Sequence, residues 1–203
     1  MSKSSLSLVL TLAAALVAGP PALAGASPAP PDKVSVTKAD PVGDGTFYPD
    51  RAAFTARQHE STDVTKVLLV ADRTNRTFTT TFTLRDLHTN AGDRQFFDID
   101  VLPEGADYDE RVNLSFYRRG GQVRVFDLAT KEFSQCRSAD VSRLWKKDQM
   151  RVEVPLSCVG NPHAASFTFY STINNDSGDQ FDPDILTDRV RATRVLHLTA
   201  PQD

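Results

Sequence analysis

The chain has 203 residues, with 23 Lys or Arg against 26 Asp or Glu, which gives a formal net charge of −3. This mildly acidic balance excludes the charge pattern of a nucleic-acid-binding protein or of a polybasic lipid-binding segment. Twelve Phe against four Tyr and one Trp is an aromatic composition typical of a packed core. The length suits one globular domain, and we expect a monomer without a nucleic-acid partner.

The first 24 residues have the pattern of a secretory signal peptide. Lys3 is followed by an apolar run over residues 6–17, and Ala22-Leu23-Ala24 supplies the small residues of a cleavage site. The apolar run is shorter than the roughly 20 residues that a transmembrane helix needs. We therefore expect cleavage near Gly25, secretion to the extracellular space and no membrane span.

The remaining sequence predicts a short linker followed by one all-β domain. Residues 25–32 (GASPAPPD) are small or Pro-rich and indicate a flexible linker before a domain over residues 33–203. Runs of period-two alternation follow, separated by Gly, Asn, Asp and Pro clusters. The predicted strands cover residues 63–72, 77–85, 95–102, 111–118, 122–127, 131–137, 150–154, 165–173 and 189–198, with a helical turn over residues 156–160.

These strands indicate the fold class. Residues 63–85 and 111–127 have the pattern of two hairpins, the second turning at Gly120-Gly121. No window longer than about ten residues shows a helical apolar stripe, so we expect almost no helix. Eight to ten short strands favour an antiparallel, jelly-roll-like β-sandwich, with a closed barrel as the alternative. The uneven lengths of strands and loops favour the sandwich.

Two cysteines, Cys136 and Cys158, are the whole cysteine content of the chain. In an exported protein an isolated pair indicates a disulfide. Neither cysteine has a second Cys or a His at the spacing of a zinc site. The chain-entropy relation gives a bond closing this loop a stabilising effect of about 3 kcal/mol.

Acidic residues gather in three regions, and loop carboxylates are the ligands that Ca²⁺ prefers. Asp40 and Asp44 flank Gly43, and Asp63 opens the first long predicted strand, so these three are our candidate calcium ligands. The other regions contain Asp98 with Asp100, on one face of a strand, and the segment Asn174–Asp188. The alternative is that these residues only form turns or a solvated strand face.

Signals for catalysis are weak, and we assign no catalytic residue. The four histidines are far apart in the sequence, and metalloprotease, nucleophile-elbow and phosphate-loop motifs are absent from it. Trp145 lies between two predicted strands in Arg143-Leu-Trp-Lys-Lys and is our candidate for stacking on a sugar ring. Its alternative role is a loop anchor on the core.

Five short motifs follow one another along the chain: Asp40-Pro-Val-Gly-Asp44, Asp63-Val-Thr, the hairpin end Arg85-Asp-Leu87, Phe97-Asp-Ile-Asp100, and Val154-Pro-Leu-Ser-Cys-Val-Gly-Asn-Pro162. In this order they resemble a pattern of poorly characterised secreted proteins of high-GC Gram-positive bacteria. The general pattern also looks like family 9 carbohydrate-binding modules and DOMON domains, which are β-sandwiches that bind sugars, haem or calcium. The resemblance implies the same architecture here, although a shared fold does not imply a shared function.

The sequence therefore predicts a secreted, non-enzymatic β-sandwich that binds a glycan or another cell-envelope component, with calcium as a structural ion. The chief alternative is a secreted hydrolase whose site is assembled from distant carboxylates. The third is a structural envelope protein without a small ligand. A concave sheet face bearing aromatic side chains would favour the first, and a deep cleft with converging carboxylates the second.

Overall fold

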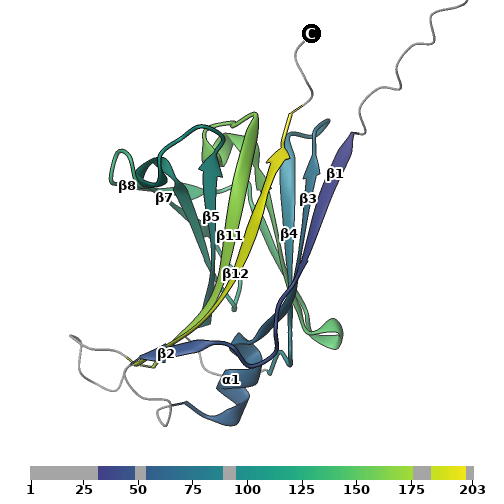
Figure 1. Ribbon diagram of the computed structural model, residues 1–203, viewed down its shortest axis with the longest axis vertical. Helices are drawn as coiled ribbons and strands as arrows, with labels where there is room; N and C mark the ends of the chain where they lie inside the picture. The colour runs from purple at the N-terminus through teal and green to yellow at the C-terminus, as the bar shows by residue number, and fades with distance from the viewer. Residues whose placement is uncertain (1–31, 49–53, 89–94, 176–183, 200–203) are drawn as a thin grey trace, which may run out of the picture.

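The structure is a computed structural model that describes residues 32–48, 54–88, 95–175 and 184–199, with the side chains of residues 48, 175, 184 and 191–194 left aside. The predicted signal peptide, residues 1–24, and all but the last residue of the predicted linker lie outside these ranges. Within them the chain forms two antiparallel sheets that face each other (Figure 1). The predicted all-β antiparallel sandwich is confirmed.

The described residues contain twelve strands rather than eight to ten, because three short strands join those that were predicted. Five strands form the small sheet, in the order β1 (Lys33–Ala39), β3 (Val64–Asp72), β4 (Thr77–Leu84), β10 (Gln149–Pro155), β9 (Asp140–Leu144). Seven form the large sheet, in the order β2 (Thr46–Tyr48), β12 (Asp184–His197), β11 (Ala164–Asn175), β5 (Gln95–Pro103), β6 (Val112–Tyr117), β7 (Val123–Asp127), β8 (Glu132–Cys136).

Helical structure is limited to short pieces, as the sequence predicts. The one α-helix of the described ranges has seven residues, and the predicted turn over residues 156–160 is a 3₁₀ helix. The pieces are α1 (Ala56–Thr62), η2 (Tyr108–Glu110), η3 (Trp145–Lys147) and η4 (Leu156–Val159). Helix α1 lies across one end of the sandwich, beside β2 (Figure 1).

The core lies between the sheets and is built from strand alternation. In β4 the side chains of Phe78 and Phe82 point inward and are fully buried. The ring of Phe82 lies 5.1 Å from that of Phe97 and 5.9 Å from that of Phe169, both in the large sheet. Burying one Phe side chain stabilises a fold by about 2–3 kcal/mol, so this aromatic layer holds the two sheets together.

The two predicted hairpins are confirmed by strand pairing. In the first, Ala71 is opposite Phe78, and the backbone N–H of Asn75 donates to Asp72 in the connecting turn at 3.0 Å. In the second, β6 pairs with β7 across the turn at Gly120 and Gly121, whose φ angles are +83° and +107°. Glycine adopts such angles without steric cost, which explains the turn.

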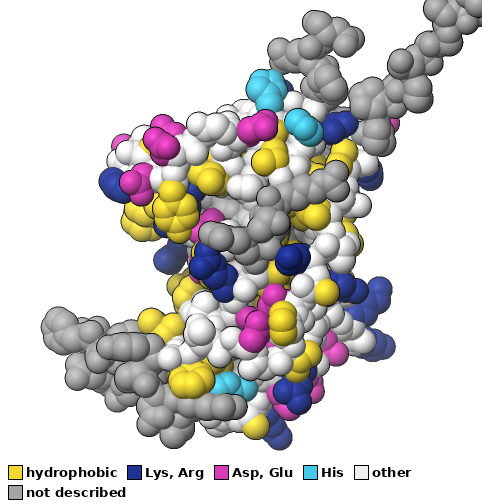
Figure 2. Space-filling view, viewed as in Figure 1, with side chains coloured by type: hydrophobic (Ala, Val, Ile, Leu, Met, Phe, Trp, Pro, Cys, Tyr) yellow, Lys and Arg dark blue, Asp and Glu magenta, His cyan; other side chains and the backbone are white. Residues whose placement is uncertain are grey.

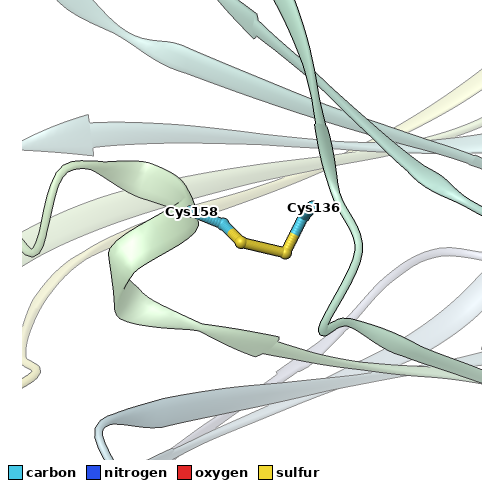
Figure 3. Close-up of a disulfide and its surroundings, with 2 residues drawn as sticks. All are labelled: Cys136 and Cys158. Carbon is cyan, nitrogen blue, oxygen red and sulfur yellow. A yellow bond between two sulfur atoms is a disulfide. The ribbon is translucent and has the colours of Figure 1, made fainter.

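A disulfide joins Cys136 to Cys158, as predicted, with 5.6 Å between their Cα atoms. Cys136 is the last residue of β8 in the large sheet, whereas Cys158 lies in η4 directly after β10 of the small sheet (Figure 3). The bond therefore connects the two sheets at the side of the sandwich where β8 and β9 are the edge strands.

Candidate functional site

The three predicted calcium ligands come from two segments that meet at the α1 end of the sandwich. Asp40 directly follows β1, Asp44 lies in the loop to β2, and Asp63 is the residue between α1 and β3. The backbone N–H of Gly43 donates to Asp63 Oδ2 at 3.0 Å, which fixes the loop against the start of β3. The expected approach of Asp63 to this loop is therefore present, while metal binding itself stays a prediction.

The structure adds a fourth carboxylate, Asp188 of β12, to this group. Its Oδ2 accepts a hydrogen bond from the backbone N–H of Val64, and its side chain is 1% exposed. Carboxylate oxygens of Asp40, Asp44 and Asp188 all lie within 4.8 Å of one another. In the sequence Asp188 ends the third acidic region, and without the sheet topology nothing links it to Asp40. We call these four residues the aspartate cluster.

Burial and mutual repulsion make two members of the aspartate cluster reluctant to ionise. Desolvation, reinforced by the charges of Asp44 and Asp63, raises the pKa of Asp40 to about 6. Desolvation, reinforced by Asp40 and Asp44, raises the pKa of Asp188 to about 7, although its hydrogen bond from Val64 acts in the opposite direction. Ionising the carboxyl groups of the aspartate cluster therefore lowers the stability of the fold.

A small cavity of about 100 Å³ lies beside this cluster. Asp63 and Asp188 line it, together with Gly43, His59 and the exposed Arg85. Its size is that of a small ion with a few water molecules rather than of a sugar, since pockets for organic ligands measure roughly 300–1,000 Å³.

Trp145, the predicted sugar-stacking residue, lies in η3 between β9 and β10. The side chain is half-buried and packs against the core. The guanidinium groups of Arg118 and Arg143 lie 5.8 Å and 5.6 Å from the ring centroid. These contacts fit the loop-anchor alternative, and sugar stacking by Trp145 stays a prediction.

The second acidic region, Asp98 with Asp100, lies on the outer face of the large sheet. Asp100 accepts a hydrogen bond from Asn113 at 2.9 Å and forms an ion pair with Arg111 at 3.4 Å. The hydroxyl of Tyr170, one strand away on β11, donates to Asp100 at 3.4 Å. Burial is the main cause that raises the pKa of Asp98 to about 6, helped by the neighbouring charge of Asp100.

Aromatic rings surround these carboxylates on the same face. Strand alternation places Phe96, Tyr117, Phe126 and Phe133 outward, from four neighbouring strands. Phe133 is 76% exposed and stacks on Phe126 with 4.4 Å between centroids, and Tyr117 is 41% exposed. We call this outward surface of β5, β6, β7, β8 and β11 the aromatic face.

The aromatic face is hollowed rather than flat. The large sheet curves so that its outer side is concave in the view of Figure 1. An open hollow of about 540 Å³ lies over its β7–β8 end and is lined by Arg124, Phe133, Gln135 and others. Hydrophobic and charged side chains gather at this end in Figure 2.

The outer face of the small sheet also forms a groove, of about 570 Å³, but its chemistry differs. The Thr side chains of β4 line its floor, with Leu68 and Arg151 on the neighbouring strands. Aromatic side chains do not line this groove among the described residues. Of the two sheet faces, only the aromatic face combines exposed rings with planar polar groups.

The chain matches no protein-family model and no curated protein sequence. Among the residues that the structure describes, no helix is long and apolar enough to cross a membrane. The function must therefore be argued from the sites themselves.

Proposed function

We propose that the protein is a secreted, non-enzymatic β-sandwich that binds a glycan of the cell envelope or the surroundings on its aromatic face. The observation that carries this proposal is the exposed stack of Phe133 on Phe126, on the same concave sheet surface as the exposed Tyr117. A sugar ring presents an apolar C–H face that packs on such rings. Phe133 and Phe126 form a stacked apolar pair at the surface, and contiguous exposed apolar groups mark interaction sites where isolated ones do not.

The polar groups of the aromatic face supply the other half of glycan recognition. Sugar hydroxyls both donate and accept hydrogen bonds, and they pair well with carboxylates, amides and guanidinium groups. Asp98 and Asn113 offer the first two types, and Arg124 lies over the Tyr117 ring at 5.6 Å. Asn113 is held by Asp100, so part of this surface is already ordered before a ligand binds.

The test is a binding panel of soluble glycans and cell-wall polysaccharides read by thermal shift and calorimetry. A ligand of the aromatic face should raise the melting temperature, and Phe133→Ala should weaken its binding about tenfold or more. The control is Leu144→Ala, which removes an exposed apolar side chain from the groove of the small sheet. Binding lost in Leu144→Ala but intact in Phe133→Ala would place the ligand on the other sheet and contradict the proposal.

A glycan hydrolase is the second candidate, and one observation favours it. Asp98 and Asp100 lie on one strand face, and only Asp100 has an arginine ion-pair partner there. Two carboxyl groups with different surroundings are what acid–base cleavage of a glycosidic bond requires. Release of reducing ends that disappears in both Asp98→Asn and Asp100→Asn would establish the hydrolase. A panel without any ligand or product would favour the structural envelope protein.

A further inference from the structure

We infer that the aspartate cluster, Asp40, Asp44, Asp63 and Asp188, binds one Ca²⁺ ion. The cluster lies at the α1 end of the sandwich and shares no residue with the aromatic face, so this inference does not depend on glycan binding. It goes beyond the sequence prediction by including Asp188, which is buried in β12.

The first argument is the state of the buried oxygens. Asp63 is only 5% exposed, and its Oδ1 has no hydrogen-bond partner among the residues that the structure describes. Asp40 Oδ2 is buried and unpartnered within the same residue ranges. A buried carboxylate oxygen normally has a partner, because its desolvation is otherwise uncompensated. Asp63 also lines the small cavity beside the cluster, which places an acceptor without a donor at the edge of an ion-sized space.

The second argument is the balance of charge. Four carboxylates converge here, and carboxylate oxygens of Asp40, Asp44 and Asp188 lie within 4.8 Å of one another. Among the described residues, no ion pair joins any of the four to a Lys or Arg. Arg85 lines the cavity but is exposed to solvent. A divalent cation among the carboxylates would remove the repulsion and give the orphan oxygens a partner.

The ligand types select the ion. Every cluster member offers oxygen, and the loop between Asp40 and Gly45 can add backbone carbonyls. Zinc would favour Cys or His ligands, and Mg²⁺ is usually bound through one or two carboxylates while it keeps several waters. Ca²⁺ takes six to eight oxygen ligands in flexible geometry, which fits four carboxylates from the β1–β2 loop, the start of β3 and the interior of β12.

A second acidic group provides a built-in comparison. Glu60, Asp86 and His88 also lie close enough to hold a metal. Here, however, His88 Nε2 is 2.9 Å from Glu60 and 3.4 Å from Asp86, so the carboxylates already have a partner. The aspartate cluster has no such internal partner in the described ranges, which is why we assign calcium to it and not to this group.

The test uses the mature, disulfide-bonded protein, stripped with a chelator and titrated with CaCl₂ by calorimetry at pH 7.5. We expect one site with a dissociation constant of about 10⁻⁴–10⁻³ M, the range of extracellular calcium modules, and a higher melting temperature in 10 mM Ca²⁺. Asp63→Asn and Asp188→Asn should weaken binding at least tenfold. Asp44→Asn should weaken it too, and because Asp44 is exposed this variant keeps the fold.

Glu60→Gln is the matched control and should leave calcium binding unchanged. A folded wild-type protein without heat or thermal shift at 10 mM Ca²⁺ would overturn the inference. So would binding that is unaffected by Asp44→Asn and Asp63→Asn, or lost in Glu60→Gln. If Arg85 is the counter-charge instead, Ca²⁺ will have no effect and Arg85→Gln will lower the melting temperature.

Discussion

Asp98 is a candidate ligand-binding side chain whose ionised carboxyl group lowers the stability of the folded chain. Its carboxyl group is largely buried between neighbouring strands, with Ser115 as its side-chain hydrogen-bond partner. Burial raises its pKa to about 6, so at neutral pH the fold keeps a desolvated negative charge beside Asp100. A residue that costs stability in this way is more easily explained by a ligand than by folding.

This cost predicts a pH-dependent effect of Asp98→Asn. The unfolded chain releases the Asp98 proton near pH 4, whereas the folded chain keeps it up to about pH 6. Between these pH values the folded chain binds more protons, so stability falls as the pH rises. Asp98→Asn should therefore be about 1–3 kcal/mol more stable than the wild type at pH 7.5 and equal to it near pH 3.5.

Urea unfolding at both pH values measures this difference. The control is Asp140→Asn, because Asp140 is an exposed strand residue that is solvated in the folded and unfolded chain alike. A stability gain of Asp98→Asn that is the same at pH 3.5 and pH 7.5 would show that packing, not charge, is responsible.

The residues of the candidate calcium site were predictable only in part. Turn residues around Gly43 and the start of a strand at Asp63 are visible locally, and this is why the sequence indicates Asp40, Asp44 and Asp63. Asp188 joins them only because β12 pairs with β2 at Thr187 and lies beside β3. Such a contact depends on sheet order, which strand alternation does not specify.

At the scale of elements, alternation identifies strands that bury one face. Strand β4 alternates buried and half-buried residues along its whole length, and its predicted and observed bounds agree to within one residue. The unpredicted strands β1, β2 and β9 are short or lie at sheet edges, and β1 and β9 have no fully buried residue. Their inward faces are short and only half-buried, with Val34 and Val36 in β1 and Val141 in β9, so their period-two signal is weak.

Helix α1 was not predicted for a similar reason. Its sequence, Ala56–Thr62, has no apolar stripe, and its buried side chains are the polar Ser61 and Thr62. The helix is held instead by a capping box between Thr55 and Gln58. The side-chain amide of Gln95 also donates to Ser61 O at 2.6 Å, so tertiary hydrogen bonds replace the hydrophobic pattern.

The disulfide links the edge strand β8 to the η4 turn, whose Leu156 and Val159 are buried in the core. Four of the five residues of β8 are exposed, and Cys136 is its buried end. Cys136→Ala with Cys158→Ala should lower the free energy of unfolding by about 3 kcal/mol, because the unfolded chain loses the loop closure. Thiol titration of denatured, unreduced wild-type protein should find no free thiol. Two free thiols would show that the bond does not form in the protein.

At the scale of the whole molecule, the two sheets are linked at two separate positions. One link is the disulfide, and the other is the aspartate cluster, in which Asp188 of the large sheet accepts a hydrogen bond from Val64 of the small sheet. Pro155, which leads into the η4 turn of Cys158, is opposite Thr77, whereas Val64, next to Asp63, is opposite Leu84. Seven residue-to-residue steps along β4 separate these positions, which corresponds to about 23 Å along the strand. The disulfide and the aspartate cluster therefore lie near opposite ends of the small sheet, and they share no residue.

Distant, independent sites have additive effects on stability, usually to within about 0.5 kcal/mol. With a dissociation constant of about 0.1 mM, 10 mM Ca²⁺ would stabilise the fold by about 2.7 kcal/mol. The variant without both cysteines should show the same calcium-dependent gain as the wild type, measured by urea unfolding with and without a chelator. A calcium-dependent gain that differs by more than about 1 kcal/mol between the two proteins would mean that the disulfide and the calcium site are energetically coupled. In that case the core between them would have to transmit strain along the full length of β4, and the disulfide and the calcium site would not stabilise the two ends of the sandwich independently.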